Sequence, residues 1–125
     1  LRAAGCCLMA SVLEKLRSAR GFAVPLPVGR DGVRLRFLRP TAMQMPRFRA
    51  GITTSLLVEH ALPWEGLTEA DVLPTGVGGD GQVPFDADLL AELLDDRPQW
   101  FKVACEGMFQ QINAWLKQQD DAAKN

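Results

Sequence analysis

Residues 74 to 86, PTGVGGDGQVPFD, form the stretch of the chain whose composition most resembles a ligand-binding loop. A phosphate-binding loop needs a lysine and a hydroxyl residue after its last glycine, at the start of a helix. Here Gly81 is followed by Gln82 and Val83, and the next helical segment begins with acids. A calcium loop needs about six to eight oxygen ligands, whereas Asp80 stands alone among glycines. The sequence therefore predicts a connecting segment and no phosphate or calcium site.

His60 is the single histidine of the chain and the first candidate for a general base. A base also needs a nucleophile and an orienting acid close to it. On a helix the adjacent Glu59 points elsewhere, and Ser55 and Thr54 are of common residue types. The carboxylates at 86, 88, 92, 95 and 96 fall at helix ends and on a polar face, as on a solvated surface. We therefore predict that the chain has no catalytic residue and is not an enzyme.

The three cysteines do not predict a metal site. Cys6 and Cys7 are adjacent and Cys105 is distant, a spacing that does not suit zinc. An odd count also argues against a disulfide framework, so we expect reduced thiols in a cytosolic protein with no metal and no cofactor. No apolar run approaches the roughly 18 residues that a membrane-spanning helix requires.

Charge is distributed unevenly along the chain. Residues 1 to 50 hold ten basic and two acidic side chains, for a net charge of +8, whereas residues 51 to 125 hold four basic and thirteen acidic side chains, for a net charge of −9. Such patterns influence association more than fold, so one interpretation is a surface for a charged partner. The other interpretation is that the two halves neutralise each other within one domain.

Six arginines make up most of the basic half, and arginine suits bidentate contacts to phosphates and carboxylates. Nucleic-acid binding is one hypothesis, but only Phe37 and Phe48 lie among the arginines, and no nucleic-acid-binding signature accompanies them. A protein surface with carboxylates is the preferred hypothesis, for example the acidic half of a second copy in a head-to-tail contact. The six are Arg30, Arg34, Arg36, Arg39, Arg47 and Arg49.

The elements that position these arginines begin with a helical pattern over residues 9 to 18, which Gly21 ends. The segment FAVPLPVGRDGVRLRFLRP then predicts a β-hairpin with a turn at GRDG. In its second strand Val33, Leu35 and Phe37 alternate with Arg34 and Arg36, which predicts one buried face and one solvated basic face.

The second half predicts helices around one long loop. A helix is expected from about 46 to 62, then an irregular stretch over 63 to 85 with a capping box formed by Thr68 and Asp71. Asp86 is expected to cap the next helix, and a long amphipathic helix is expected over about 98 to 118. Its broad apolar face either packs in the core or contacts a partner, with Trp100, Phe109 and Trp115 as anchors.

These patterns predict a single α+β domain over residues 1 to 125, namely a β-hairpin followed by a small domain of three to four helices. Met9 resembles a natural start, so residues 1 to 8 are expected to be atypical or disordered. The polar residues 119 to 125 are expected to fray.

The order of three segments resembles the tail assembly chaperones of long-tailed bacteriophages and prophages. The first segment, VPLPVGRDGVRLRFLRPT, is a hairpin that turns into a helix; the second, ALPWEGLTEADVLP, ends a helix in a Trp-Glu-Gly step and an acidic turn. The third, GGDGQVPFDADLLAELLDDRPQWF, is a Pro-Phe step into an acidic helix, and a closing amphipathic helix follows. The resemblance covers roughly residues 12 to 118 and rests on the order of these segments.

This resemblance implies a non-catalytic protein of the bacterial host cytoplasm. Such chaperones coat the tape-measure protein during tail assembly, are generally absent from the finished virion, and in some cases self-assemble into spirals. The major tail protein would be a second partner. Two alternatives stay open, a structural head–tail adaptor or tail-completion protein, and a small nucleic-acid-binding protein that uses the arginine-rich hairpin.

Overall fold

The computed structural model describes residues 11–73 and 78–124 as a small α+β fold, as the sequence predicted. In chain order the elements are α2 (Val12–Arg20), β1 (Gly21–Pro25), β2 (Arg34–Leu38), α3 (Met45–Arg49), α4 (Thr54–Glu59), β3 (Ala61–Glu65), α5 (Glu69–Val72), α6 (Ala87–Asp96) and α7 (Pro98–Lys124).

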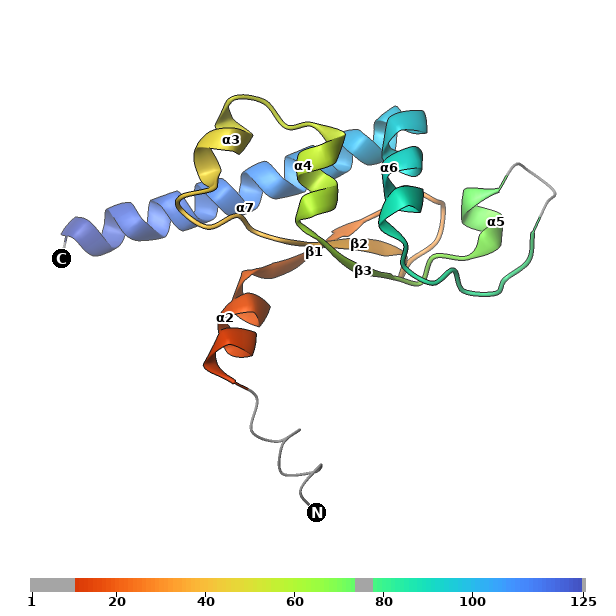
Figure 1. Ribbon diagram of the computed structural model, residues 1–125, viewed down its shortest axis with the longest axis horizontal. Coiled ribbons are helices and arrows are strands. Elements are labelled where there is room, and N and C mark those ends of the chain that lie inside the picture. Colours follow the sequence, from red (N-terminus) through yellow and green to blue (C-terminus); the bar gives the residue numbers. More distant parts are fainter. Residues whose placement is uncertain (1–10, 74–77, 125) are drawn as a thin grey trace, which may run out of the picture.

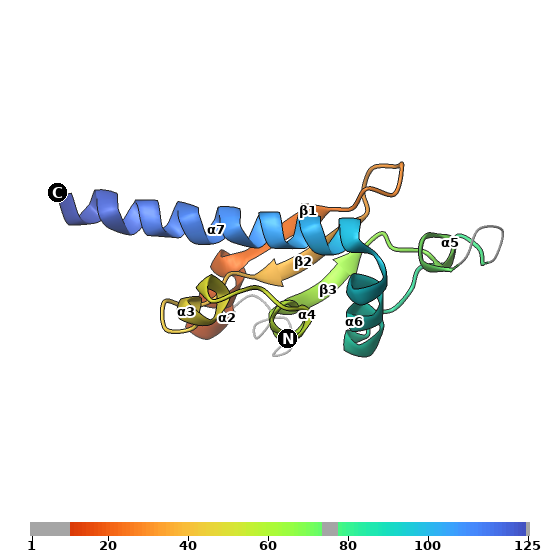
Figure 2. The same cartoon turned by 90° about the horizontal axis from the view of Figure 1, so that it is seen from above.

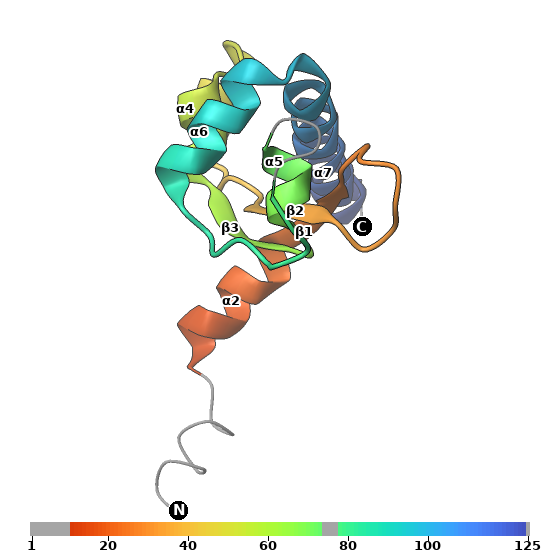
Figure 3. The same cartoon turned by 90° about the vertical axis from the view of Figure 1, so that its right-hand side faces the viewer.

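The three strands form an antiparallel sheet in the order β1-β2-β3. The expected hairpin is β1 with β2, and Phe22 pairs with Phe37 in its register. On the other side of β2, Phe37 pairs with Ala61 of β3, and the register shifts between Arg34 and Arg36. The helices α3, α4, α6 and α7 lie on one side of this sheet and α2 projects from the other side (Figures 1 and 3).

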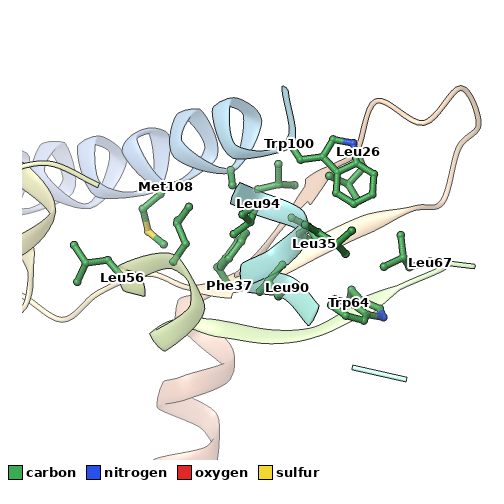
Figure 4. Packing of buried hydrophobic residues seen from close by; sticks show 14 of the residues in the cluster. Leu26, Leu35, Phe37, Leu56, Trp64, Leu67, Leu90, Leu94, Trp100 and Met108 are labelled. Carbon is green, nitrogen blue, oxygen red and sulfur yellow. The ribbon is translucent and has the colours of Figure 1, made fainter. Parts of the chain in front are cut away.

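The core lies between the sheet and the helices. The alternation predicted for β2 is confirmed, because Val33, Leu35 and Phe37 are all buried. Figure 4 shows Leu35 and Phe37 gathered with side chains of α6 and α7. The buried partners from these two helices are Leu90, Leu93, Leu94, Trp100, Ala104, Met108 and Ile112.

Close packing of α7 on β1 depends on Gly107. A methyl group at this position would lie 2.6 Å from Cγ2 of Val24, which is well inside van der Waals contact. The absence of a side chain therefore lets the helix approach the strand, and α7 runs along β1 and continues past the end of the sheet (Figure 2).

Two local predictions are confirmed at helix starts. The side chain of Asp86 accepts a hydrogen bond of 3.0 Å from the backbone N–H of Leu89 at the start of α6. Thr68 and Asp71 form the expected capping box of α5. Because these contacts join residues three apart, sequence spacing is enough to predict them.

Three boundary predictions are wrong. The helix expected from 46 to 62 is divided into α3 and α4, with Gly51 at φ 142° between them. Residues 61 to 65, expected to end that helix and begin a loop, form β3, and α7 continues to Lys124 instead of ending near 118. Residues 1 to 8, expected to be atypical, lie outside the described residues.

Candidate functional site

The arginines of β2 lie on the side of the sheet opposite α3, α4, α6 and α7. Side chains alternate along a strand, so Arg34 and Arg36 point away from the core that Leu35 and Phe37 enter. A side-chain carbon at Gly21 would lie 3.8 Å from Nη2 of Arg36 and 3.6 Å from Cδ1 of Leu62, which places these groups on the same side. We call this surface the open sheet face; it comprises Gly21, Ala23, Pro25, Arg34, Arg36, Leu38, Leu62 and Glu65.

The two arginines of the open sheet face differ in their partners. Nε of Arg34 lies 3.7 Å from Oε1 of Glu65 on the neighbouring strand, with both side chains about half exposed. Arg36 is half-buried beside Leu62, and within residues 11–73 and 78–124 it has neither an ion pair nor a side-chain hydrogen bond. The open sheet face therefore presents a guanidinium whose charge no carboxylate among the described residues neutralises.

A second pair of arginines lies where α2 joins the sheet. The backbone N–H of Arg39 donates to the carbonyl of Arg20 at 2.8 Å, which holds the two residues together. Burial of Arg39 and, secondarily, the charge of Arg20 lower the pKa of the Arg39 guanidinium. Nε of Arg20 is buried and has no hydrogen-bond partner among the described residues. Like charges held together in this way favour an anionic partner.

Arg39 itself points toward the helical side. Its Nη1 donates to the carbonyl of Pro40 at 2.8 Å, and its guanidinium lies 5.2 Å from the ring centre of Trp115. Arg47 and Arg49, also predicted as partner-binding residues, belong to α3 in the helical layer and are exposed there. The structure therefore does not gather the predicted arginines on one surface.

Neutralisation within the domain accounts for part of the charge asymmetry. Arg30 in the hairpin loop donates to Oδ2 of Asp71 at 2.5 Å and to the carbonyl of Gly66 at 2.9 Å. Arg47 lies 3.2 Å from Glu59. With the pair of Arg34 and Glu65, three arginines of the basic half thus have acidic partners from the second half, as the alternative interpretation of the charge pattern requires.

The prediction that Trp100 is one of three aromatic anchors for a partner is wrong. Its side chain is buried in the core, and the guanidinium of Arg97 lies 4.6 Å from its ring centre. Trp115 is half-buried beneath Arg39, whereas Phe109 is 42% exposed. The apolar face of α7 serves mainly as core, and Phe109 is the one of the three that is largely accessible.

Sequence reasoning missed the exposed apolar side chains of α2. Val12, Leu13 and Leu16 are 72%, 55% and 58% exposed, and α2 contains no buried residue. The spacing of these residues marks one helix face, and that is the signal the sequence offered. An identical pattern is expected for a helix packed on a core, so only the structure reveals that no other described element covers this face.

The outer face of α6 is acidic and borders two shallow depressions. One is lined by Val83, Pro84, Phe85, Asp86, Asp88, Leu89 and Glu92. The next is lined by Val72, Leu89, Glu92, Leu93, Asp95, Asp96 and Arg97. Since Leu89 and Glu92 line both, the two depressions adjoin along α6, and each combines apolar side chains with carboxylates.

The contacts of His60 and Cys105 are those of residues that pack within the fold. Nδ1 of His60 lies 3.1 Å from the carbonyl of Leu56, Nε2 lies 3.3 Å from Oε1 of Gln44, and the ring contacts Phe48 edge-on. Burial, followed by the charge of Glu106, raises the pKa of the Cys105 thiol, which disfavours the reactive thiolate. The described residues contain no cluster of three or more His, Cys, Asp or Glu side chains suited to a metal ion.

The described part of the glycine-rich stretch is bound to the segment that follows β3. The carbonyls of Gly81 and Gly79 accept hydrogen bonds from the backbone N–H groups of Glu69 and Ala70, the first two residues of α5. These N–H groups are the ones that a phosphate at the start of α5 would need. The connecting role predicted for the stretch agrees with these contacts, while residues 74 to 77 lie outside the described residues.

Nε1 of Trp64 donates to the carbonyl of Val83 at 2.7 Å, and its ring packs against Phe85. The Trp-Glu-Gly step therefore holds the segment before α6 against β3.

None of the described helices is both long and apolar enough to span a membrane. Comparisons with protein-family models, with curated proteins and with solved structures returned no match for this chain.

Proposed function

We propose that this chain is a non-catalytic assembly factor that binds another protein through its open sheet face, in the manner of phage tail assembly chaperones. Arg36 carries this proposal. It is a half-buried guanidinium in the middle of a three-stranded sheet, beside Leu62, with no acidic partner among the described residues. A surface that combines a half-buried arginine with an apolar neighbour suits a protein partner, because arginine is prominent at the centres of interfaces.

The partner we propose is the long helical tape-measure protein, with the major tail protein as a further partner, in the cytoplasm of the bacterial host. The order of segments described above supports this choice. Carboxylates spaced along a helical partner would pair with Arg36 and with Arg20 at the end of α2, which likewise lacks an acidic partner among the described residues. Head-to-tail self-association of the chain is part of the same proposal.

Co-expression with the tape-measure protein of the same gene cluster tests the proposal. The chain should raise the soluble fraction of the tape-measure protein and co-purify with it. Arg36→Glu should lower the amount that co-purifies about tenfold, since one lost charge-assisted contact at an interface costs more than about 1.4 kcal/mol. Arg49→Glu makes the same charge change at an exposed residue of α3, outside the open sheet face, and should leave co-purification unchanged.

Two results would contradict the proposal. One is a tape-measure protein that is no more soluble with the chain than without it. The other is a chain that remains in purified virions at a fixed stoichiometry, which would favour a head–tail adaptor. Duplex DNA binding whose affinity falls steeply with salt would favour the nucleic-acid hypothesis instead.

A further inference from the structure

We infer that α2 docks in the acidic depressions along α6 of a second copy of this chain, so that copies join head to tail. The inference rests on the self-association proposed above and not on the identity of the tape-measure partner. It assigns the contact to two surfaces outside the open sheet face.

The apolar face of α2 needs a cover that the described part of its own chain does not provide. Val12, Leu13 and Leu16 are large apolar side chains that are more than half exposed, although they share one face of a nine-residue helix. Removing apolar surface from water is the main driving force of protein association, so these three side chains favour docking on another surface.

The charges of α2 flank this apolar face. At about 100° per residue, Lys15 lies on one side of the apolar residues and Arg17 on the other, while Glu14 lies on the opposite face. Neither Lys15 nor Arg17 has an ion-pair partner among the described residues. A binding site for α2 should therefore be an apolar trough edged with carboxylates.

The depressions along α6 have these properties. Leu89 lies between them, with Val83 and Phe85 at one end and Leu93 at the other. Asp88, Glu92 and Asp96 are exposed and form no ion pair with any described residue. With ten residues, α6 is about 15 Å long, close to the roughly 14 Å of α2.

The two surfaces of one copy cannot meet. α2 ends at Arg20 and β1 begins at Gly21, so no linker separates the helix from the sheet. α2 projects from the side of the sheet opposite α6, as Figures 1 and 3 both show. Without a linker it cannot turn back to reach α6 of its own copy. Because α2 of one copy must reach α6 of the next, the contact is heterologous and propagates into a ring or an open chain.

The first test is the mass of the full-length chain by size-exclusion chromatography with light scattering over a range of concentrations. We expect wild type to form oligomers that grow with concentration and that weaken as salt screens the exposed charges. Leu16→Asp should weaken association at least tenfold. The control is Met43→Asp, which changes a 90% exposed apolar residue in the turn before α3 and should have no effect. Leu16 contributes nothing to the core, so circular dichroism should report an intact fold.

The second test distinguishes a heterologous contact from other modes. Leu16→Asp disables the α2 surface, and Glu92→Lys disables the α6 surface. At concentrations where wild type forms oligomers, each variant alone should be a monomer. A mixture of the two retains one intact α2 surface and one intact α6 surface, and it should form a 1:1 dimer that does not grow further. Asp31→Lys, at an exposed acid of the hairpin loop, is the matched control for Glu92→Lys and should assemble like wild type.

A wild-type chain that stays monomeric at all concentrations would overturn the inference. So would oligomers that survive Leu16→Asp, or a mixture of the two variants that stays monomeric. None of these results would contradict the proposed binding of the tape-measure protein, because that binding is assigned to Arg36. Conversely, loss of co-purification in Arg36→Glu with unchanged oligomers would separate the two surfaces.

Discussion

The two faces of the sheet are built from alternate residues of the same strand, yet they differ in almost every physical property. Leu35 and Phe37 of β2 are 1% and 0% exposed and pack under α6 and α7. Arg34 and Arg36, one residue away in each case, lie on the open sheet face. One short strand can therefore supply stability on one side of the sheet and leave the other side available for binding.

The largest expected effect is on the covered face. Phe37→Ala removes a fully buried ring that packs against Phe22, with ring centres 5.9 Å apart, so the free energy of unfolding should fall by about 3–5 kcal/mol. Denaturant titration followed by tryptophan fluorescence measures this. Arg36→Ala in the same strand should change the free energy by no more than about 0.5 kcal/mol. Equal losses in the two variants would refute the division of roles between the faces.

A smaller effect is expected where α7 meets β1 on the covered face. Replacing a helical glycine with alanine normally stabilises a helix by about 1 kcal/mol. At Gly107 the new methyl group would lie 2.6 Å from Cγ2 of the buried Val24, and overpacking of a core costs about 1–3 kcal/mol. We therefore expect Gly107→Ala to lower the melting temperature. A rise would mean that α7 does not lie against β1 as described.

Much of the covered face could be predicted from the sequence, because alternation along β2 and the caps at Thr68 and Asp86 are local signals. β3 could not. Leu62, Pro63 and Trp64 form a short segment with a proline, and their extended conformation depends on pairing with β2 some 25 residues earlier in the chain. Helix propensity alone also could not show that Gly51 separates α3 from α4.

The candidate binding surfaces were only partly predictable for a related reason. Arg34 and Arg36 were placed correctly by alternation, but their ion-pairing could not be read from spacing. Arg30 meets Asp71 and Arg34 meets Glu65 across the hairpin and the sheet, so these contacts follow from the fold. Whether the apolar face of α2 is covered also depends on where the helix lies, which its own residues do not determine.

An effect of about 1 kcal/mol is expected at Asp71, beyond the end of the sheet. Burial tends to raise the pKa of its carboxyl group, but hydrogen bonds from Thr68 and Arg30 outweigh burial and lower the pKa. The folded protein then binds fewer protons than the unfolded chain. The stability that the ionised Asp71 carboxylate contributes is fully present above the pKa of an aspartate in the unfolded chain, about 3.9. It is lost as the pH falls through the lower pKa of Asp71 in the folded protein.

Asp71→Asn should therefore destabilise the protein near neutral pH by about 1 kcal/mol, the usual cost of losing a helix cap, and should flatten the decline in stability below about pH 4. Thermal melts from pH 7 to pH 2.5 measure both effects. Asp80→Asn, at an exposed acid of the glycine-rich stretch, is the control and should leave the pH profile unchanged. A parallel decline in wild type and Asp71→Asn would contradict the role of the Arg30 and Thr68 contacts.

The smallest effect on stability is expected at Arg34, which shares the open sheet face with Arg36. The pair of Arg34 and Glu65 is about half exposed at 3.7 Å, so Arg34→Ala should cost no more than about 0.5 kcal/mol. If the face served only to hold the strands together, Arg34→Ala would destabilise more than Arg36→Ala, because Arg34 alone has an acidic partner there. If the face binds a partner, Arg36→Ala should weaken co-purification more than Arg34→Ala, because Arg36 has no carboxylate to release before it binds another. The stability ranking is expected under both explanations, so co-purification decides between them: equal co-purification of Arg34→Ala and Arg36→Ala would contradict a binding role for the open sheet face.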